Sequence, residues 1–253
     1  GNKFEFRMPG SSQSIAGPAT VLNTIMAEEL EQFYNKLKDA RDFTAALHQL
    51  IRDTFIAHRR IIFNGNGYED AWVKEAERRG LANLKNAAEA LPAYVLPKNI
   101  DLMTRHGVYT REEMLSRHEI HIEKYCKVIR IEASTMVDMV QHGILNAASE
   151  YEAKLCDTIL SKHAAAPELS CHVESSLVNT VGVLNEQLLE QTVALKTALE
   201  TAPEDTCEDT LRYYHDTVEG GMEKVSRTVD QLESLMASKY WPYPTFSDIL
   251  FSV

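Results

Sequence analysis

The first regular pattern of apolar and polar positions lies at residues 3–8, where the two kinds of side chain alternate. Alternation with a period of two is typical of a β-strand with two different faces. One face carries Lys3, Glu5 and Arg7, and the other carries Phe4, Phe6 and Met8. The apolar face can pack on a core, but the charged face cannot be buried without partners. We therefore predict a strand over residues 2–8 whose charged face lines a functional site.

The pattern then changes to a helical period, which predicts helices at about 19–38, 42–58 and 72–79. In the second helix Asp42 is a suitable N-cap, and the apolar positions recur at helical spacing. These positions are Phe43, Leu47, Leu50, Ile51 and Phe55. Prolines at 92 and 97 predict a loop in that region.

The sequence Asn64-Gly65-Asn66-Gly67 predicts a turn with positive φ. It lacks the Lys-Ser/Thr of a phosphate-binding P-loop and the strand context of a dinucleotide fold. This favours a structural turn over the alternative, a loop at the mouth of a substrate site.

From residue 110 the pattern is helical almost to the end of the chain. Thr110 and Glu113 form a capping-box signature, and the helix that they begin is expected to reach about Ser161, with Gly143 as its weak point. Two later segments have the alternating spacing of four and three that is typical of coiled-coil seams. The seam positions are Leu177, Val181, Leu184, Leu188, Gln191, Leu195 and Ala198, then Leu211, His215, Val218, Met222, Val225, Val229, Leu232 and Met236. Three such helices with short connections predict antiparallel neighbours in a long bundle.

The chain ends in an aromatic segment, Tyr240-Trp241-Pro242-Tyr243-Pro244-Thr245-Phe246. Exposure of so apolar a tail would be unfavourable, so it should dock on the body of the protein or on a neighbouring subunit. Together the patterns predict a mainly α protein with one domain at 1–109 and a helical bundle domain at 110–253.

Composition narrows the class of protein. The 253 residues are 44% hydrophobic and carry a formal net charge of −11, which argues against nucleic acid or an anionic membrane as a partner. No apolar run approaches the roughly 20 residues that span a bilayer. The four cysteines lack the spacing of a zinc site. We expect reduced thiols and a cytoplasmic protein.

Several polar residues in the helical region have two interpretations. His118 and His121 have the spacing of a ligand pair on a helix, but no further ligands complete a metal site, so solvated helix faces are favoured. His215 at a seam position is more typical of a satisfied bundle histidine than of a catalytic base. Glu132 and Asp138 lie in an apolar stretch and should pair with a cation from another helix, or contact a partner subunit.

The opening strand and the loop after it resemble the last barrel strand of glutamine synthetases, which has the pattern arginine–x–glutamate–x–arginine–x–proline. The matching residues here are Lys3, Glu5, Arg7 and Pro9, with lysine in place of the first arginine. Three later segments are similar to the long, type III members of that family. They are residues 60–68 (RIIFNGNGY), 131–139 (IEASTMVDM) and 240–246 (YWPYPTF).

The resemblance implies that residues 1–109 are the end of an α+β catalytic domain, with a single strand left from its barrel. In such an enzyme ATP phosphorylates the γ-carboxylate of glutamate, and ammonia then displaces phosphate to give glutamine. It implies that Glu5 binds Mg²⁺ or Mn²⁺, that Arg7 holds the transferring phosphoryl group and the glutamate, and that Lys3 contacts nucleotide phosphate. Carboxylate ligands for a hard cation and fixed cations for phosphoryl transfer both suit that chemistry.

The resemblance also implies self-association into stacked hexameric rings. The remaining metal ligands of the family lie on strands absent from this sequence, so we expect the chain alone to be inactive. The competing hypothesis is a non-catalytic helical module for oligomerisation or regulation, which the seams and the aromatic tail favour beyond about residue 110.

Overall fold

The computed structural model describes residues 13–251, so the predicted strand at 2–8 lies outside the described residues. Within that range every regular element is helical, which confirms a mainly α protein. The chain separates into two compact units, residues 1–118 and 119–253. The helices are α1 (Ala16–Leu37), α2 (Phe43–Ala57), η1 (Arg59–Ile61), α3 (Asp70–Arg78), α4 (Ala87–Tyr94), α5 (Pro97–Arg105), α6 (Arg111–Met139), η2 (Val140–Ile144), α7 (Leu145–Ala165), α8 (His172–Glu200), α9 (Glu208–Tyr213), η3 (Tyr214–Glu219), α10 (Gly220–Leu235), η4 (Ser238–Tyr240) and α11 (Phe246–Phe251).

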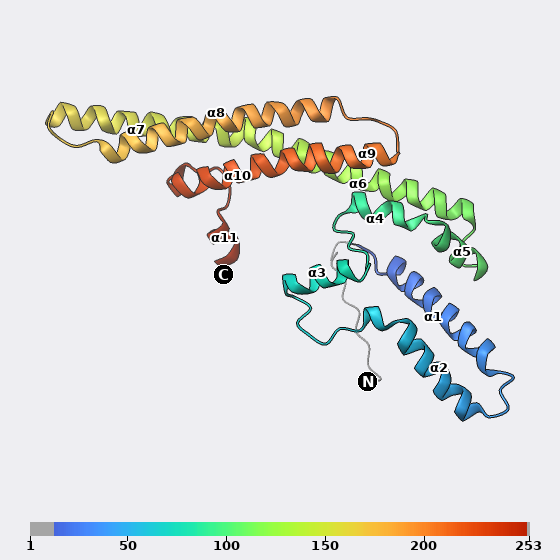
Figure 1. Ribbon diagram of the computed structural model, residues 1–253. Coiled ribbons are helices and arrows are strands. Elements are labelled where there is room, and N and C mark those ends of the chain that lie inside the picture. Colours follow the sequence, from blue (N-terminus) through green and yellow to red (C-terminus); the bar gives the residue numbers. More distant parts are fainter. Residues whose placement is uncertain (1–12, 252–253) are drawn as a thin grey trace. The chain divides into compact units, whose positions relative to one another are not determined.

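The first unit is organised around α1, α2, α4 and α5 (Figure 1). Its core is a small cluster of buried side chains, Ile100, Met103 and Met114, against which Val21 and Tyr109 pack. The predicted cap of α2 is confirmed, since the Ala45 amide donates to Asp42 Oδ1 at 3.0 Å. The apolar stripe of α2 is only partly covered, however. Leu50 is buried, whereas Phe43 and Phe55 are 57% and 62% exposed.

The segment with two prolines was wrongly predicted to be a loop. It forms α4 and α5 instead. Pro97 occupies the start of α5, where a missing amide hydrogen leaves no intrahelical bond unmade. Asn86 caps α4 by accepting from the Glu89 amide at 2.8 Å, and Asn99 Nδ2 donates to the Ala93 carbonyl at 2.6 Å near the end of that helix. Side-chain caps therefore sustain two short helices that the prolines alone did not suggest.

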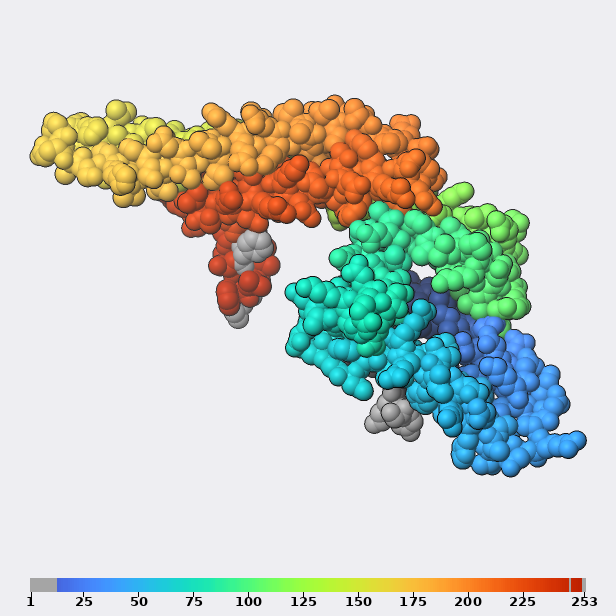
Figure 2. Space-filling model, in the orientation of Figure 1, coloured from blue at the N-terminus to red at the C-terminus, as the bar shows by residue number. Residues whose placement is uncertain are grey.

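The second unit is a bundle of long helices (Figure 1). Its first helix, α6, begins within the first unit at the predicted capping box, where Thr110 N donates to Glu113 Oε2 at 2.8 Å and Glu113 N donates to Thr110 Oγ1 at 3.1 Å. The chain continues through η2 and α7, returns as α8, and turns again as α9, η3 and α10. α8 packs against both α7 and α10, and Figure 2 shows the side chains of α8 and α10 closing against each other.

Both predicted seams face the interior of this bundle. Val181, Leu188, Leu195, Leu211 and Val225 are almost completely buried. Polar side chains also join the helices: Thr228 Oγ1 of α10 donates to Gln191 Oε1 of α8 at 2.9 Å, and Asn185 Nδ2 of α8 donates to Ser149 Oγ of α7 at 3.2 Å. Such bonds favour one register of the helices over others.

The predicted weak point at Gly143 is a π-helical turn, η2. A π turn widens the helix and leaves carbonyl groups without their usual partners. The tail uses this opening, because the Tyr243 hydroxyl donates to the Met139 carbonyl at 3.2 Å. A Cβ atom at position 143 would lie 2.6 Å from that hydroxyl, so the close approach requires glycine.

The aromatic tail therefore docks on the body of the protein, one of the two expected arrangements. Trp241 is buried, and the Tyr240 ring lies 5.4 Å from that of Tyr151. The last described residues are exposed: Ile249, Leu250 and Phe251 are 64%, 72% and 77% exposed.

All four cysteines are free thiols. Among the described helices, none is both long enough and apolar enough to cross a bilayer.

Candidate functional site

Lys3, Glu5 and Arg7, the residues predicted to line an active site, all lie outside the described residues. The described geometry begins at residue 13. Within residues 13–251, polar side chains gather at two places in the first unit. One place joins α1 to the end of α5, and the other surrounds the turn after η1.

The first cluster is built on Glu28 of α1. Its Oε1 accepts from Gln32 Nε2 at 2.7 Å and lies 2.9 Å from Arg105 Nη2, while its Oε2 lies 2.7 Å from His106 Nε2. The Glu28 and His106 side chains are each about 15% exposed. The hydrogen bonds from Gln32 and His106, with the charge of Arg105, hold the pKa of Glu28 below its usual 4.5.

Glu28, Glu31 and His106 each offer a ligand atom within 4.8 Å of the other two, so the cluster has the donor set of a divalent-cation site. Arg105 argues against that use. Its guanidinium already neutralises the Glu28 carboxylate, and it would lie beside any bound dication. The arrangement is that of an ion-pair network that ties the end of α5 to the middle of α1.

The second cluster is organised by Arg79, the C-cap residue that follows α3. Its Nε lies 2.6 Å from Glu75 Oε1, and its Nη1 donates to the carbonyls of Arg60 and Ile62 at 3.1 and 2.8 Å. Hydrogen bonds from Arg78 and Arg79 lower the pKa of Glu75 to about 2. One guanidinium therefore connects α3 to the chain that leaves η1.

The turn at residues 64–67 is held by this cluster rather than by backbone conformation. The Phe63 and Trp72 rings stack with centroids 4.2 Å apart, and Arg79 lies over Trp72 at 5.7 Å. The predicted positive φ is wrong: within the described residues only Gly80 and Gly107 have it. Gly65 is needed for another reason, because its Cβ would lie 2.5 Å from the Phe63 ring.

Beyond this support the turn presents polar groups to solvent. Asn66 Oδ1 accepts from the Tyr68 amide at 3.1 Å, and Asn66 Nδ2 donates to Glu69 Oε1 at 3.0 Å. Tyr68 is 92% exposed. These contacts describe a structural turn with an exposed tip. They bring no nucleophile or catalytic base into contact with the tip.

The histidine candidates do not form a metal or catalytic site within the described residues. His118 is buried and His121 is exposed, so their side chains point in different directions from α6. His215 Nδ1 lies 2.7 Å from Glu219 Oε2 within η3, which is the satisfied bundle histidine that was favoured. Near it, burial and the adjacent Glu219 carboxylate raise the pKa of Tyr125.

The expected cross-helix ion pairs of Glu132 and Asp138 are absent from the described residues. Asp138 Oδ1 lies 3.5 Å from His142 Nε2 of the next helical turn. Glu132 has no ion pair in the part of the chain that the structure describes, and it lies at the edge of an apolar groove between α6 and α10. Sequence spacing could not reveal either the groove or the Glu28 cluster, because each joins residues about 80 to 90 positions apart.

Comparison with known proteins places this chain beside one enzyme family. Residues 46–163 match the model of the glutamine synthetase C-terminal domain. The chain is 34% identical over 257 residues to a protein named glutamine synthetase from Butyrivibrio fibrisolvens, and 34% identical over 263 residues to one named type-3 glutamine synthetase from Dictyostelium discoideum. A glutamine synthetase from Bacteroides fragilis is 26% identical over 264 residues.

These matches cover 99–100% of this chain but only 35–36% of each relative. The chain thus spans about a third of the length of the curated relatives that it matches. The similarity includes both the opening segment with Lys3, Glu5 and Arg7 and the helical bundle, because it extends over nearly the whole of the chain.

Proposed function

Because this chain belongs to the glutamine synthetase family, we propose that it forms the C-terminal third of an ATP-dependent glutamate–ammonia ligase. The observation that supports the proposal is the match of the entire chain to a third of two glutamine synthetases at 34% identity. In the proposed reaction the γ-phosphoryl group of ATP passes to a γ-carboxylate oxygen of glutamate, which leaves ADP and γ-glutamyl phosphate. Ammonia then attacks the carbonyl carbon, the carbon–oxygen bond breaks, and phosphate leaves.

The contribution of this chain to that chemistry would come from its opening segment. We propose that Glu5 is one ligand of Mg²⁺ or Mn²⁺, that Arg7 stabilises charge on the transferring phosphoryl group, and that Lys3 contacts nucleotide phosphate. A carboxylate suits a hard divalent cation, and a fixed guanidinium can stabilise developing charge without reorganisation. Lysine offers a point charge rather than a planar fork, so Lys3 would bind phosphate less directionally than arginine.

Glu5 alone cannot hold a catalytic metal, since such sites need several ligands. Within residues 13–251 the one carboxylate–imidazole cluster with a suitable donor set is already neutralised by Arg105. The other ligands would therefore come from the two thirds of such an enzyme that this chain does not include. We propose that the 253-residue chain alone makes no glutamine and that the whole enzyme acts in the cytoplasm as stacked hexameric rings.

The test is glutamine formation by the full-length enzyme with changes in the opening segment. Glu5→Gln keeps the shape of the side chain but removes its charge, so activity should fall and excess Mn²⁺ should restore part of it. Arg7→Ala should lower kcat by on the order of a hundredfold or more, without recovery by metal. Near-normal turnover of Arg7→Ala would show that the charged face does not line the site. Turnover by the isolated chain that chelation removes would refute the need for the remaining ligands.

A second candidate, a helical assembly or regulatory module, is favoured by the bundle itself. The buried seams and the docked tail build a rigid body in which no catalytic cluster appears among the described residues. Both functions can hold for different parts of one chain. We propose that residues 1–109 complete the catalytic domain and that residues 110–253 serve assembly. Leu184→Asp in the full-length enzyme would then change the size of the assembly, whereas Arg7→Ala would leave it unchanged.

A further inference from the structure

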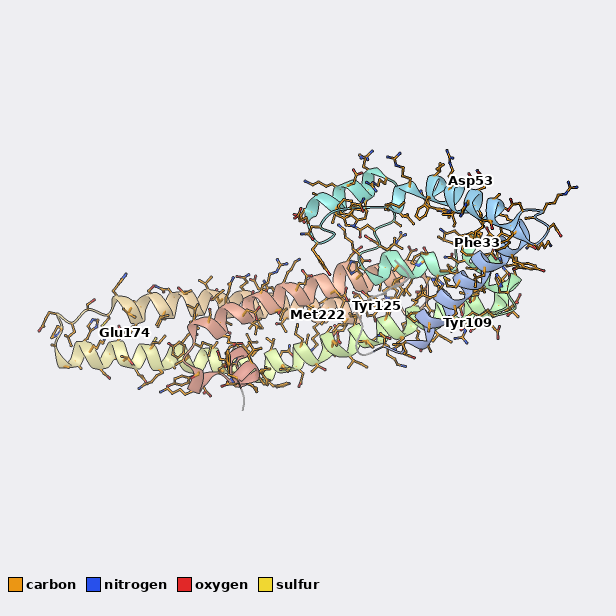
Figure 3. The ribbon with its side chains drawn as sticks, turned by 90° about the horizontal axis from the view of Figure 1, so that it is seen from below. Phe33, Asp53, Tyr109, Tyr125, Glu174 and Met222 are labelled. Atoms are coloured by element: carbon orange, nitrogen blue, oxygen red, sulfur yellow. The ribbon has the colours of Figure 1, made fainter. Side chains whose placement is uncertain are left out.

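The second unit contains an apolar groove between α6 and α10 that no described side chain fills. Its volume is about 440 Å³, and eight of its eleven lining residues are aliphatic or methionine. Met136, Met139 and Met222, the last labelled in Figure 3, form the thioether part of the lining. Unbranched methionine side chains adapt to differently shaped apolar partners and are common on surfaces that bind helices.

The groove is open along α6. Val128, Ile131, Thr135 and Met139 recur at spacings of three and four, which places them on one face of the helix. Val128 and Ile131 are 42% and 60% exposed, and Met139 is 37% exposed. This stripe is therefore not part of the closed seam that α7, α8 and α10 share. A periodic apolar stripe beside an apolar groove is the surface that an amphipathic helix recognises.

Charge indicates which kind of helix would fit. Residues 119–253 carry 22 acidic and 10 basic side chains, whereas residues 1–118 carry 15 and 16. At the groove itself the one charged lining residue is Glu132, and it has no ion pair among the described residues. Glu223, next to Met222 in the sequence, is paired with Arg227 at 3.0 Å, so that arginine does not supply a cation for Glu132. An occupant with Lys or Arg beside its apolar stripe would provide the missing partner.

The chain's own segments fit poorly. The exposed tail residues Ile249, Leu250 and Phe251 are apolar, but the one charged residue of α11 is Asp248. A second copy of α11 would therefore bring another carboxylate to an acidic surface, which charge complementarity disfavours.

We propose that the groove between α6 and α10 binds a basic amphipathic helix of another protein. The apolar stripe of that helix would lie on Ile131, Met139 and Met222, and one of its basic residues would pair with Glu132. The lining residues on α6 and η2 extend from Ile131 to Ile144, which is about 20 Å of helix. A partner helix of roughly four turns would cover this length.

The direct test uses a fluorescent model peptide of about 18 leucine and lysine residues arranged as an amphipathic helix, a length that exceeds the roughly four turns needed. Its binding to the 253-residue chain is measured by fluorescence anisotropy. Two control peptides share the length: one has the same composition in an order that breaks the apolar stripe, and the other has glutamate in place of lysine. We expect the basic amphipathic peptide to bind and both controls to bind at least about tenfold more weakly.

Variants of the chain locate the binding. Met139→Arg, at a partly exposed position, should weaken the peptide about tenfold. Glu132→Lys should weaken it about fivefold, and Glu150→Lys, the same charge change on the exposed surface of α7, by less than about twofold. Circular dichroism confirms that each variant remains folded. The more conservative Met139→Gln provides a second measurement if Met139→Arg loses helicity.

Three results would overturn the proposal. No binding of the basic amphipathic peptide would exclude this class of partner. Equal effects of Glu132→Lys and Glu150→Lys would show attraction to the acidic unit in general rather than to the groove. Sedimentation of the chain alone as a dimer that Met139→Arg dissociates would show that a second copy fills the groove. None of these results bears on glutamine formation, so they leave the ligase proposal standing.

Discussion

Gly143→Ala is a sharp test of how the tail docks, because one added carbon meets one identified contact. A Cβ atom at this position would lie 2.6 Å from the Tyr243 hydroxyl and 3.1 Å from two atoms of its ring. The Tyr243 side chain would have to move. Its hydrogen bond to the Met139 carbonyl would then be lost.

Two effects of this change on stability oppose each other. Loss of the hydrogen bond costs about 1 kcal/mol. Alanine in place of glycine within a helix stabilises it by up to about 1 kcal/mol. We therefore expect a melting temperature close to that of the unchanged chain, together with a docking equilibrium of the tail that shifts about fivefold toward release. Trp241 is buried, so the release should be confined to residues 243 onward.

Hydrogen exchange with peptide-level mass spectrometry measures both consequences. Exchange of residues 243–251 should rise several-fold, while α8 and α10 remain protected. Tyr243→Phe removes only the hydroxyl and should release the tail in the same way. Gly182→Ala is the matched control, because its Cβ would meet Glu152 and not the tail. Unchanged exchange of the tail in Gly143→Ala, or equal exchange in the Gly182→Ala control, would refute the reasoning.

Three further predictions concern the bundle, the first unit and the thiols. Leu184→Asp replaces a seam leucine that is 8% exposed with a carboxylate lacking a cation. It should lower the free energy of unfolding by about 3–5 kcal/mol in urea titrations, whereas Glu186→Gln on the exposed face should be nearly silent. Equal unfolding midpoints for the two variants would show that the predicted seam register is wrong. The pKa of Glu28 is lowered in the folded chain, so its contribution to stability is present above pH 4.5 and is lost as pH falls through the folded-state pKa. Glu28→Gln should therefore destabilise the chain at pH 7, and the difference in the free energy of unfolding should shrink as the pH is lowered below 4.5. A difference that grows on acidification would contradict the network. With thiol reagents at pH 8, exposed Cys156 should react early and Cys126 last, because burial raises the pKa of the Cys126 thiol to about 11. Rapid labelling of Cys126 would mean that this part of α6 opens.

The features predicted best from the sequence were those with local causes. The capping box at Thr110 and the N-cap at Asp42 each need only four residues, and both are present. The seams were predicted because their period repeats over seven or more positions, so single exceptions do not hide it. Gly143 was identified as a weak point of the helix from its residue type alone. Neither the π turn nor the contact with Tyr243 could be predicted from that residue type.

The errors came from local rules that a neighbouring side chain overrode. Prolines 92 and 97 predicted a loop, but Asn86 and Asn99 satisfy the ends of α4, which contains Pro92. Pro97 stands at the start of α5, a position that accepts proline. The glycines of the 64–67 turn predicted positive φ, while the requirement at Gly65 is room for the Phe63 ring. Identical residues can serve conformational freedom or close approach, and only the fold distinguishes them.

A periodic apolar pattern indicates which face of a helix is covered, but not what covers it. For α8 and α10 the partners are in the same chain, so their seams are closed and Val181, Leu188 and Val225 are buried. For α2 the same kind of stripe leaves Phe43 and Phe55 more than half exposed, because α1 covers only part of it. The α6 stripe differs from the α2 stripe in having at its edge a carboxylate, Glu132, that has no ion pair among the described residues. That carboxylate is what favours a basic partner for α6, and the α2 stripe offers no comparable indication.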